Sequence, residues 1–345
     1  MADALTAFAA HARDRSWSNG PSPLGGPMRT RLAILSPLLA LLLLTTSARG
    51  VTKGGVPDAG EHSMVGQLVF YVPDALPSPY GADQPGGWFS CSGTLLSGTV
   101  VVTAGHCTFA IGLDSVSTTT EENRFTAEDG NGTGGNDVWF SLNEDDDHWD
   151  GWPLTFDEDG NLNFPSQQAR YRARRDFLSG NPLWVRATAF PHPEYDDRAF
   201  YLHDAGVIEL DEAQPGPYAT IPTADYLQKY AGRRNEHRFE VVGYGLERAH
   251  PVFETGGDTR LKAEPRLLNL VSNPKETYIQ LSNNPVTGGT CFGDSGGPTF
   301  DNTNSLLVVA VTSFGYSPNC TGVGGAYRLD QPDDLEFLAG HGITP

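Results

Sequence analysis

The stretch Gly98–Cys107, GTVVVTAGHC, joins a run of β-branched residues to a histidine and a cysteine. Valine and threonine favour extended backbone, so Gly98–Thr103 is predicted to be a buried strand. Similar runs, separated by Gly, Pro, Asn or Asp, are Met64–Val72, Trp184–Ala189, Ala205–Leu210, Phe239–Tyr244 and Leu306–Thr312. Helical patterns are few, near Thr223–Tyr230 and Pro332–Ala339. Many short strands without alternating helices predict an all-β barrel or sandwich.

The composition supports a turn-rich, acidic protein with a substantial core. Of 345 residues, 40 are Gly and 25 are Pro, and hydrophobic residues make up 39%. This is enough apolar material for one large core or two ordinary ones, so whole-chain disorder is excluded. Asp and Glu number 42 against 23 Lys and Arg, which gives a net charge of −19. A phosphate-binding surface needs clustered cations, so we expect no nucleic-acid partner and no anionic-membrane partner.

The N-terminus resembles a secretory signal. Residues 32–44, LAILSPLLALLLL, are almost purely apolar, follow Arg29 and Arg31, and precede small residues. The apolar core is shorter than the ~20 residues that span a bilayer. We therefore interpret residues 1–48 as a signal or leader segment, with a buried helix or an uncleaved anchor as the alternative. Export implies an oxidising compartment, in which the four cysteines can form two disulfides and the mature protein has no stable membrane association.

Residues 121–170 carry 13 acidic residues against two basic ones, a net charge of −11. We interpret this segment as a solvated surface insertion. The alternative is a structural calcium site, because Asp157 and Asp159 offer hard oxygen ligands beside the turn-forming Gly160. The spacing of a full twelve-residue calcium loop is missing, so no cofactor is predicted to be required.

Three short motifs carry residues suited to covalent catalysis. TAGHC contains His106, HDAGVI contains Asp204, and GDSGGP contains Ser295. A serine hydroxyl needs a neighbouring base to become a nucleophile, and histidine fits that task. The imidazole needs a carboxylate behind it to fix its tautomer. The developing oxyanion needs rigid donors, which the backbone N–H groups of Gly293 and Ser295 are placed to supply.

Taken together, in the order His, Asp, Ser, these strings resemble the chymotrypsin/trypsin-like serine endopeptidases. The resemblance covers roughly residues 51–340 and implies two six-stranded antiparallel β-barrels with a short C-terminal helix. It places the first barrel in residues 51–215, with the acidic insertion, and the second in residues 216–345. It further implies a secreted serine endopeptidase, monomeric, acting on protein or peptide substrates.

The resemblance also assigns roles to single residues. His106 corresponds to the general base, Asp204 to the orienting carboxylate and Ser295 to the nucleophile. Asp196 and Asp197 lie just upstream and are competing candidates for the carboxylate. We prefer Asp204 because an apolar-rich run, AGVIEL, follows it, as in the family.

The family's disulfides imply the pairs Cys91–Cys107 and Cys291–Cys320. The specificity pocket is expected to include Gly289, Thr290, Ser313, Phe314, Gly315 and Gly325. Gly289 stands where members that cut after Lys or Arg carry an Asp, and Ser313 is expected to bond Asp204. A buried Lys or Arg without a counter-charge would cost several kcal/mol, so an apolar or aromatic residue is predicted at the cleavage position. Thr290 and Thr312 leave smaller polar side chains as the alternative.

Activation in this family frees an amine that pairs with the aspartate before the nucleophile, here Asp294. The chain offers Val51-Thr52-Lys53-Gly54-Gly55, one residue longer than the usual start, so Val51 is the candidate new N-terminus. Gly50 or Arg49, left by signal cleavage, are alternatives. Two other function classes remain open: a catalytically silent binding protein with a protease fold, and a calcium-binding or adhesion module that works through the acidic insertion.

Overall fold

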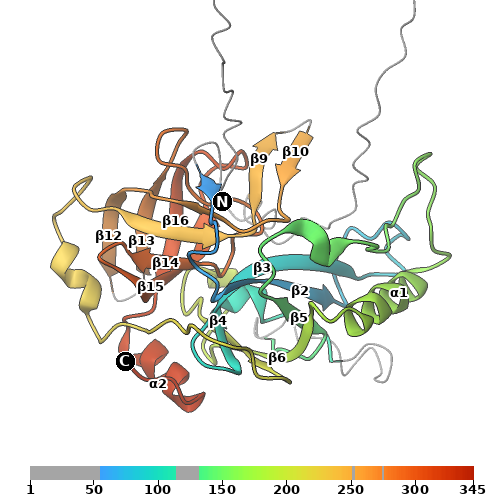
Figure 1. Ribbon diagram of the computed structural model, residues 1–345, viewed down its shortest axis with the longest axis horizontal. Helices are drawn as coiled ribbons and strands as arrows, with labels where there is room; N and C mark the ends of the chain where they lie inside the picture. Colours follow the sequence, from blue (N-terminus) through green and yellow to red (C-terminus); the bar gives the residue numbers. More distant parts are fainter. Residues whose placement is uncertain (1–54, 114–131, 251–252, 274–275) are drawn as a thin grey trace, which may run out of the picture.

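The computed structural model describes residues 55–113, 132–250, 253–273 and 276–345 (Figure 1). The predicted leader 1–48 and the candidate N-terminus Val51 lie outside these residues. Within the described ranges no helix is long and apolar enough to cross a membrane. The two α-helices are α1, Gln167–Gly180, and α2, Pro332–Gly340. Short 3₁₀ helices are η2 (Gly105–Cys107), η3 (Asp146–Trp149), η4 (Asp197–Ala199) and η5 (Tyr226–Tyr230).

The first half is a closed six-stranded barrel in the order β2-β3-β4-β7-β6-β5. Its strands are β2 (Val65–Val72), β3 (Gly87–Leu95), β4 (Val100–Thr103), β5 (Val138–Ser141), β6 (Val185–Pro191) and β7 (Gly206–Leu210). The antiparallel partners β4 and β7 are paired from Val100↔Glu209 to Thr103↔Gly206. The end of β4 therefore lies beside the start of β7. This register brings the residues after Thr103 next to those before Gly206, although about a hundred residues separate them in the chain.

The second half is an eight-stranded sheet in the order β1-β11-β8-β14-β15-β16-β13-β12. Its strands are β1 (Val56–Pro57), β8 (Phe239–Gly243), β11 (Leu261–Ala263), β12 (Leu267–Asn273), β13 (Glu276–Asn283), β14 (Pro298–Asp301), β15 (Asn304–Gly315) and β16 (Gly322–Arg328). The Phe239 N–H donates to the Pro265 carbonyl and the Leu267 N–H donates to the His237 carbonyl. These bonds bring the start of β12 back to β8, so the sheet curls on itself. The predicted all-β fold with a short C-terminal helix is confirmed, but the second half is an eight-stranded half-barrel and not a closed six-stranded barrel.

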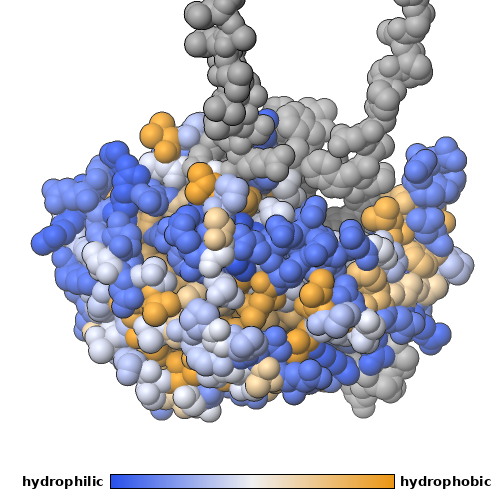
Figure 2. Space-filling model, viewed as in Figure 1, coloured by the Kyte–Doolittle hydropathy of each residue, from blue (hydrophilic) through white to orange (hydrophobic). Residues whose placement is uncertain are grey.

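The hairpin of β9 (Leu246–His250) and β10 (Phe253–Gly256) stands apart from both sheets. The two halves share one apolar core: Val242, Phe300 and Tyr327 of the second half cluster with the interior of the first barrel. Burial of a continuous apolar surface opposes separation of the halves. Hydrophilic residues cover much of the face in Figure 2, with apolar residues in scattered patches, in keeping with the acidic composition.

The acidic segment 121–170 is not a pure surface insertion, and this part of the prediction is wrong. Its residues Val138–Ser141 form the barrel strand β5, and all four are buried. Helix α1, which begins within the segment, was also not predicted. Ser166 caps it by accepting the Ala169 N–H. The helix lies at the outer edge of the first barrel (Figure 1).

Between α1 and the first barrel lies a separate aromatic cluster, built around Trp88, Trp139, Tyr171 and Trp184. The buried face of α1 includes Arg170 and Arg174, both of which donate to Thr155 Oγ1 at 2.9 Å. Arginines on the buried face hide the hydrophobic period that normally reveals a helix in sequence. The segment therefore extends the first barrel with a helix and a second, aromatic core.

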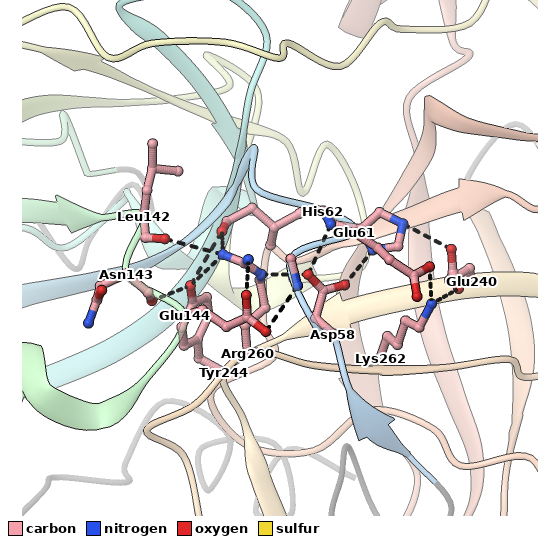
Figure 3. A network of polar contacts seen from close by, with 12 residues as sticks. Asp58, Glu61, His62, Leu142, Asn143, Glu144, Glu240, Tyr244, Arg260 and Lys262 are labelled. Carbon is pink, nitrogen blue, oxygen red and sulfur yellow. Dashed lines mark hydrogen bonds and ion pairs between the residues drawn. The ribbon is translucent and has the colours of Figure 1, made fainter.

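A buried ionic network ties the N-terminal segment to both halves (Figure 3). Asp58 accepts hydrogen bonds from Arg260 Nε at 2.9 Å and from the His62 backbone N–H at 2.9 Å, and it contacts His62 Nδ1 at 2.5 Å. Arg260 also donates to Glu144 at 2.9 Å and to the Tyr244 hydroxyl at 3.2 Å. Because Glu144 follows the first barrel's β5 and Tyr244 follows the second half's β8, Arg260 bridges the two.

Burial opposes ionisation of Asp58, but hydrogen bonds from His62 and Arg260 outweigh it and lower the pKa of Asp58 to about 2. Burial likewise favours neutral His62, but Asp58 and Glu240 outweigh it and raise the pKa of His62 to about 9. The Asp58 contribution is present above its ordinary pKa of 3.8 and is lost as the pH falls toward 2. The His62 contribution is present below 6.5 and is lost as the pH rises through 9.

We predict that Asp58→Asn destabilises the protein by roughly 3 kcal/mol at pH 6, the usual scale for a broken buried ion pair. The loss is expected to be smaller at pH 10, because His62 is then neutral in the parent protein as well. Urea unfolding at the two pH values measures the difference. Arg198→Gln is the control, since it breaks an exposed pair with Asp196 and is expected to cost less than about 1 kcal/mol. Equal losses for Asp58→Asn at both pH values would contradict the role given to His62.

Candidate active site

His106 lies in η2, directly after β4. The predicted disulfide between Cys91 on β3 and Cys107 is present and fixes this turn to the barrel. The ring of His106 is mostly buried, with 16% of the side chain exposed. Its position follows from the register of β4 with β7, which sets the η2 turn against the residues that precede β7.

The buried Asp204 carboxylate is the partner of His106. Asp204 Oδ2 lies 3.0 Å from His106 Nδ1, and Asp204 Oδ1 accepts the His106 backbone N–H at 2.9 Å. Ser313 on β15 donates its hydroxyl to Asp204 Oδ2 at 2.5 Å, as the resemblance implied. Of the competing candidates, Asp196 instead caps η4 and pairs with Arg198. The carboxylate that contacts His106 is therefore Asp204, and it bonds both the ring and the backbone N–H of this histidine.

Ser295 lies in the tight loop before β14, and the predicted disulfide Cys291–Cys320 is present beside it. The Ser295 carbonyl accepts the Ser92 N–H from β3 at 2.8 Å. Gly296 has a φ of +75°, and a Cβ there would lie 1.9 Å from Thr103 Oγ1 and 2.7 Å from the Ala104 nitrogen. Only glycine permits this approach. The loop of the predicted nucleophile, residues 291–297 (the nucleophile loop), is thereby packed against the residues that lead into His106.

The atoms that a reaction would use are free of other partners. In the described part of the chain, His106 Nε2 is buried and makes no hydrogen bond. The backbone N–H groups of Asp294, Gly296 and Gly297 all donate to carbonyls, whereas within the described residues those of Gly293 and Ser295 do not donate to any protein group. Gly293 has a φ of +94°, which turns the loop at this point. Two unoccupied N–H donors beside a serine are what an oxyanion site requires.

Asp294 is completely buried behind the nucleophile loop. Its Oδ1 accepts the Gly245 N–H at 2.8 Å and its Oδ2 accepts the Cys291 N–H at 2.7 Å. Burial raises its pKa to about 7, although these two hydrogen bonds act in the opposite direction. Within the described residues no cation pairs with Asp294. The candidate partner, an amine at Val51, lies outside them.

The predicted pocket residues fall into two groups. A Cβ on Gly289 would lie 2.4 Å from Asn283 Cγ, and Asn283 Nδ2 donates to the Thr290 carbonyl at 2.7 Å. A Cβ on Gly324 would lie 3.2 Å from Thr290 Oγ1. Gly289, Thr290 and Gly324 therefore form the first group, and the side-chain amide of Asn283 lies beside Gly289.

Gly325 belongs to the other group. A Cβ on Gly325 would lie 2.4 Å from the ring of Phe314, which is itself packed against Phe200 and Tyr278. The glycine that faces Thr290 is Gly324, one residue before the predicted pocket residue Gly325. Gly315 is paired with Gly324 across β15 and β16, so it stays with the first group.

The weak calcium candidates lie at an exposed turn. Asp157 Oδ1 accepts the backbone N–H groups of Asp159 and Asn161, at 3.0 and 2.8 Å, and Asp157 Oδ2 accepts from the Asn161 side chain at 3.1 Å. Gly160 has a φ of +81°, which closes the turn. The Asp157 carboxylate is thus engaged in turn formation with neighbouring groups.

Two contributors to this region were not anticipated. Ser92 holds the nucleophile loop through its N–H and also donates its hydroxyl to the Gly293 carbonyl at 2.9 Å. Asn283 faces Gly289 from β13. Neither carries a sequence signal, because their role depends only on which loops the fold brings beside them.

The comparisons agree with this geometry. Residues 174–330, which contain Asp204 and Ser295, match the family model described as Trypsin. The resemblance to the chymotrypsin/trypsin-like serine proteases is therefore confirmed over this part of the chain. No curated protein matches the chain.

Among solved structures, HL collagenase is 15% identical with a TM-score of 0.49, covering 86% of this chain and 100% of that one. Human heparin binding protein is 15% identical with a TM-score of 0.49, covering 83% and 95%. The scabies mite inactivated protease paralogue S-D1 is 12% identical with a TM-score of 0.48, covering 86% and 100%.

We predict that the unprocessed chain, with residues before Val51 intact, loses stability on the order of 4 kcal/mol between pH 4 and pH 7.5 through Asp294. The sign follows because the unfolded carboxyl ionises near 3.8 while the folded one resists until about 7. Asp294→Asn is expected to remove this part of the pH dependence, which denaturant unfolding across the range measures. An unchanged pH dependence in Asp294→Asn would show that the carboxyl has a cationic partner before processing.

Proposed function

We propose that the protein is a serine endopeptidase that cleaves peptide bonds through Ser295, His106 and Asp204. The observation that carries this proposal is the buried Asp204 carboxylate, which bonds both the ring and the backbone of His106 beside the GDSGGP loop. Asp204 keeps the proton on Nδ1, so Nε2 presents a lone pair that can accept the Ser295 proton. Hydrogen bonds in such sites tighten when substrate binds.

The reaction follows in two halves. Ser295 Oγ attacks the substrate carbonyl carbon while His106 Nε2 takes its proton, and the tetrahedral oxyanion accepts from the N–H groups of Gly293 and Ser295. His106 then returns the proton to the leaving amine, and the peptide bond breaks to leave an acyl-enzyme. Water, activated by the same histidine, hydrolyses the ester and restores Ser295.

We predict that a fluorophosphonate labels Ser295 in the processed protein and does not label Ser295→Ala. Asp204→Asn is expected to lower kcat by about 10⁴, because the amide favours the wrong histidine tautomer. Asp196→Asn is the matched control, since this aspartate contacts Arg198 and not His106, and it is expected to keep kcat within about twofold. Absence of labelling in correctly processed protein would favour the alternative, a silent binding protein with a protease fold.

Apolar or aromatic residues are proposed at the cleavage position. The chemical groups around Gly289, Thr290 and Gly324 support this proposal. They are glycines, a hydroxyl and the Asn283 amide, and none of them is a carboxylate. A Lys or Arg side chain of the substrate placed there would lose its water without gaining a counter-charge. Because of the Thr290 hydroxyl, smaller polar side chains at the cleavage position are the second candidate.

Peptide substrates that differ only in Phe, Leu, Ala, Glu or Arg at the cleaved residue test this preference. We predict the highest kcat/KM for Phe or Leu and a value at least about 100-fold lower for Arg, the scale of an unpaired buried cation. A preference for Arg would overturn the pocket assignment while leaving the nucleophile in place.

Secretion and activation belong to the same proposal. The apolar run at 32–44 and the two disulfides support an extracellular enzyme, which is proposed to be monomeric and to act on proteins or peptides. A new amine at Val51 is proposed to pair with Asp294, because β1 at Val56–Pro57 joins β11, which in turn pairs with β8 ahead of Gly245. Five residues separate Val51 from Val56, enough extended chain to cover about 17 Å.

A further inference from the structure

Two histidines and an aspartate lie close together where α2 packs against the first barrel. His192 follows β6, His203 directly precedes Asp204, and Asp333 lies in the first turn of α2. One ligand-type atom from each of the three lies within 4.8 Å of the others. His192 is buried, and His203 and Asp333 are partly exposed. The three residues come from three separate elements, so neither helix periodicity nor strand alternation explains their meeting.

The contact between His203 and Asp333 resembles a pair of metal ligands more than a hydrogen bond. His203 Nδ1 lies 3.0 Å from Asp333 Oδ2, yet Nδ1 is buried and has no hydrogen-bond partner of adequate geometry. Ligand atoms that each lie about 2.0–2.2 Å from a zinc ion are separated by roughly this distance or slightly more. The backbone of His203 has a φ of +51°, an unusual value for a non-glycine residue, which turns its ring toward α2.

We propose that His192, His203 and Asp333 form a binding site for a divalent transition metal of the zinc class. Imidazole nitrogens with one carboxylate oxygen form a donor set that suits zinc, and hard cations such as calcium prefer all-oxygen sites. Water supplies the fourth position, and the Glu194 carboxylate, which lies 3.4 Å from His203 Nε2 and is 68% exposed, is placed to accept from the ring nitrogen that does not bind the metal.

His192 must adjust when the metal binds. Its Nδ1 accepts the Glu194 backbone N–H at 3.1 Å, so in the metal-free protein the ring proton lies on Nε2. Coordination through Nε2 moves that proton to Nδ1 and gives up the bond to Glu194. The ring is stacked on His203 with centroids 5.0 Å apart and rests against Phe337 of α2, and it must shift on metal binding so that the new Nδ1–H does not face the Glu194 N–H.

The site would connect α2 to the segment that carries Asp204. Because His203 and Asp204 are adjacent, a metal held by His203 and Asp333 fixes the C-terminal helix to the residue before the buried carboxylate. This inference does not depend on the proposed peptidase activity, and its test uses binding and stability alone.

The experiment is a titration of the EDTA-treated, dialysed full-length chain with ZnCl₂, followed by isothermal calorimetry and by thermal unfolding. One zinc ion per chain is expected, together with a rise in Tm that grows with zinc concentration by mass action. Asp333→Asn and His203→Gln are expected to weaken Kd at least about tenfold, a loss seen even for groups that only support a ligand. Calcium chloride at the same concentrations is expected to give no comparable shift.

His341→Gln is the matched control. His341 also contacts a carboxylate, Glu209, at 2.8 Å near α2, but it has no third ligand within the described residues. It is expected to leave zinc binding unchanged. No zinc binding by the parent chain overturns the proposal, and so does equal binding by the parent, Asp333→Asn and His203→Gln, which would place the zinc elsewhere. Circular dichroism confirms that the variants are folded.

Discussion

The Asp204 carboxylate is fully buried and takes hydrogen bonds from both halves of the molecule. His106 approaches it from the first barrel and Ser313 from the second, so the geometry of the site depends on how the barrels are docked. A buried charge is tolerated only when its oxygens are satisfied, and here three donors satisfy them. A shift of one half relative to the other would remove hydrogen bonds to this carboxylate. The stability of the contact between the halves and the geometry of the site therefore depend on each other.

Two other buried carboxylates, Asp58 and Asp294, differ in how the cost of burying a charge is offset. Asp58 is surrounded by Arg260 and His62, which keep it ionised and join the N-terminal segment to both halves (Figure 3). Asp294 has only two backbone N–H donors, and burial raises its pKa to about 7. The first carboxylate is a fixed structural element. The second has no cationic partner among the described residues, and the amine proposed at Val51 would supply one.

Several strands were predictable because they are short runs of β-branched and apolar residues separated by turn-forming residues. GTVVVT and the run at 205–210 became β4 and β7, and the four cysteines paired as the family resemblance implied. Helix α1 was missed because arginines lie on its buried face, where a periodicity search expects apolar side chains. β5 was missed because it is a short apolar run inside an acidic segment. Gly325 was predicted in the specificity pocket, but the sequence could not show that it lies against the Phe314 ring while Gly324 faces Thr290.

The sequence by itself determined the β-rich class, which depends on residue types within short runs, and its motifs implied the candidate triad and the cysteine pairs through the family resemblance. Only the tertiary structure decided that Asp204 and not Asp196 contacts His106, since the register of β4 against β7 chooses between aspartates a few residues apart. The same holds for Arg260 between the barrels and for His192, His203 and Asp333 beside α2. Such contacts join positions far apart in the chain, and the packing of whole strands and helices sets their distances.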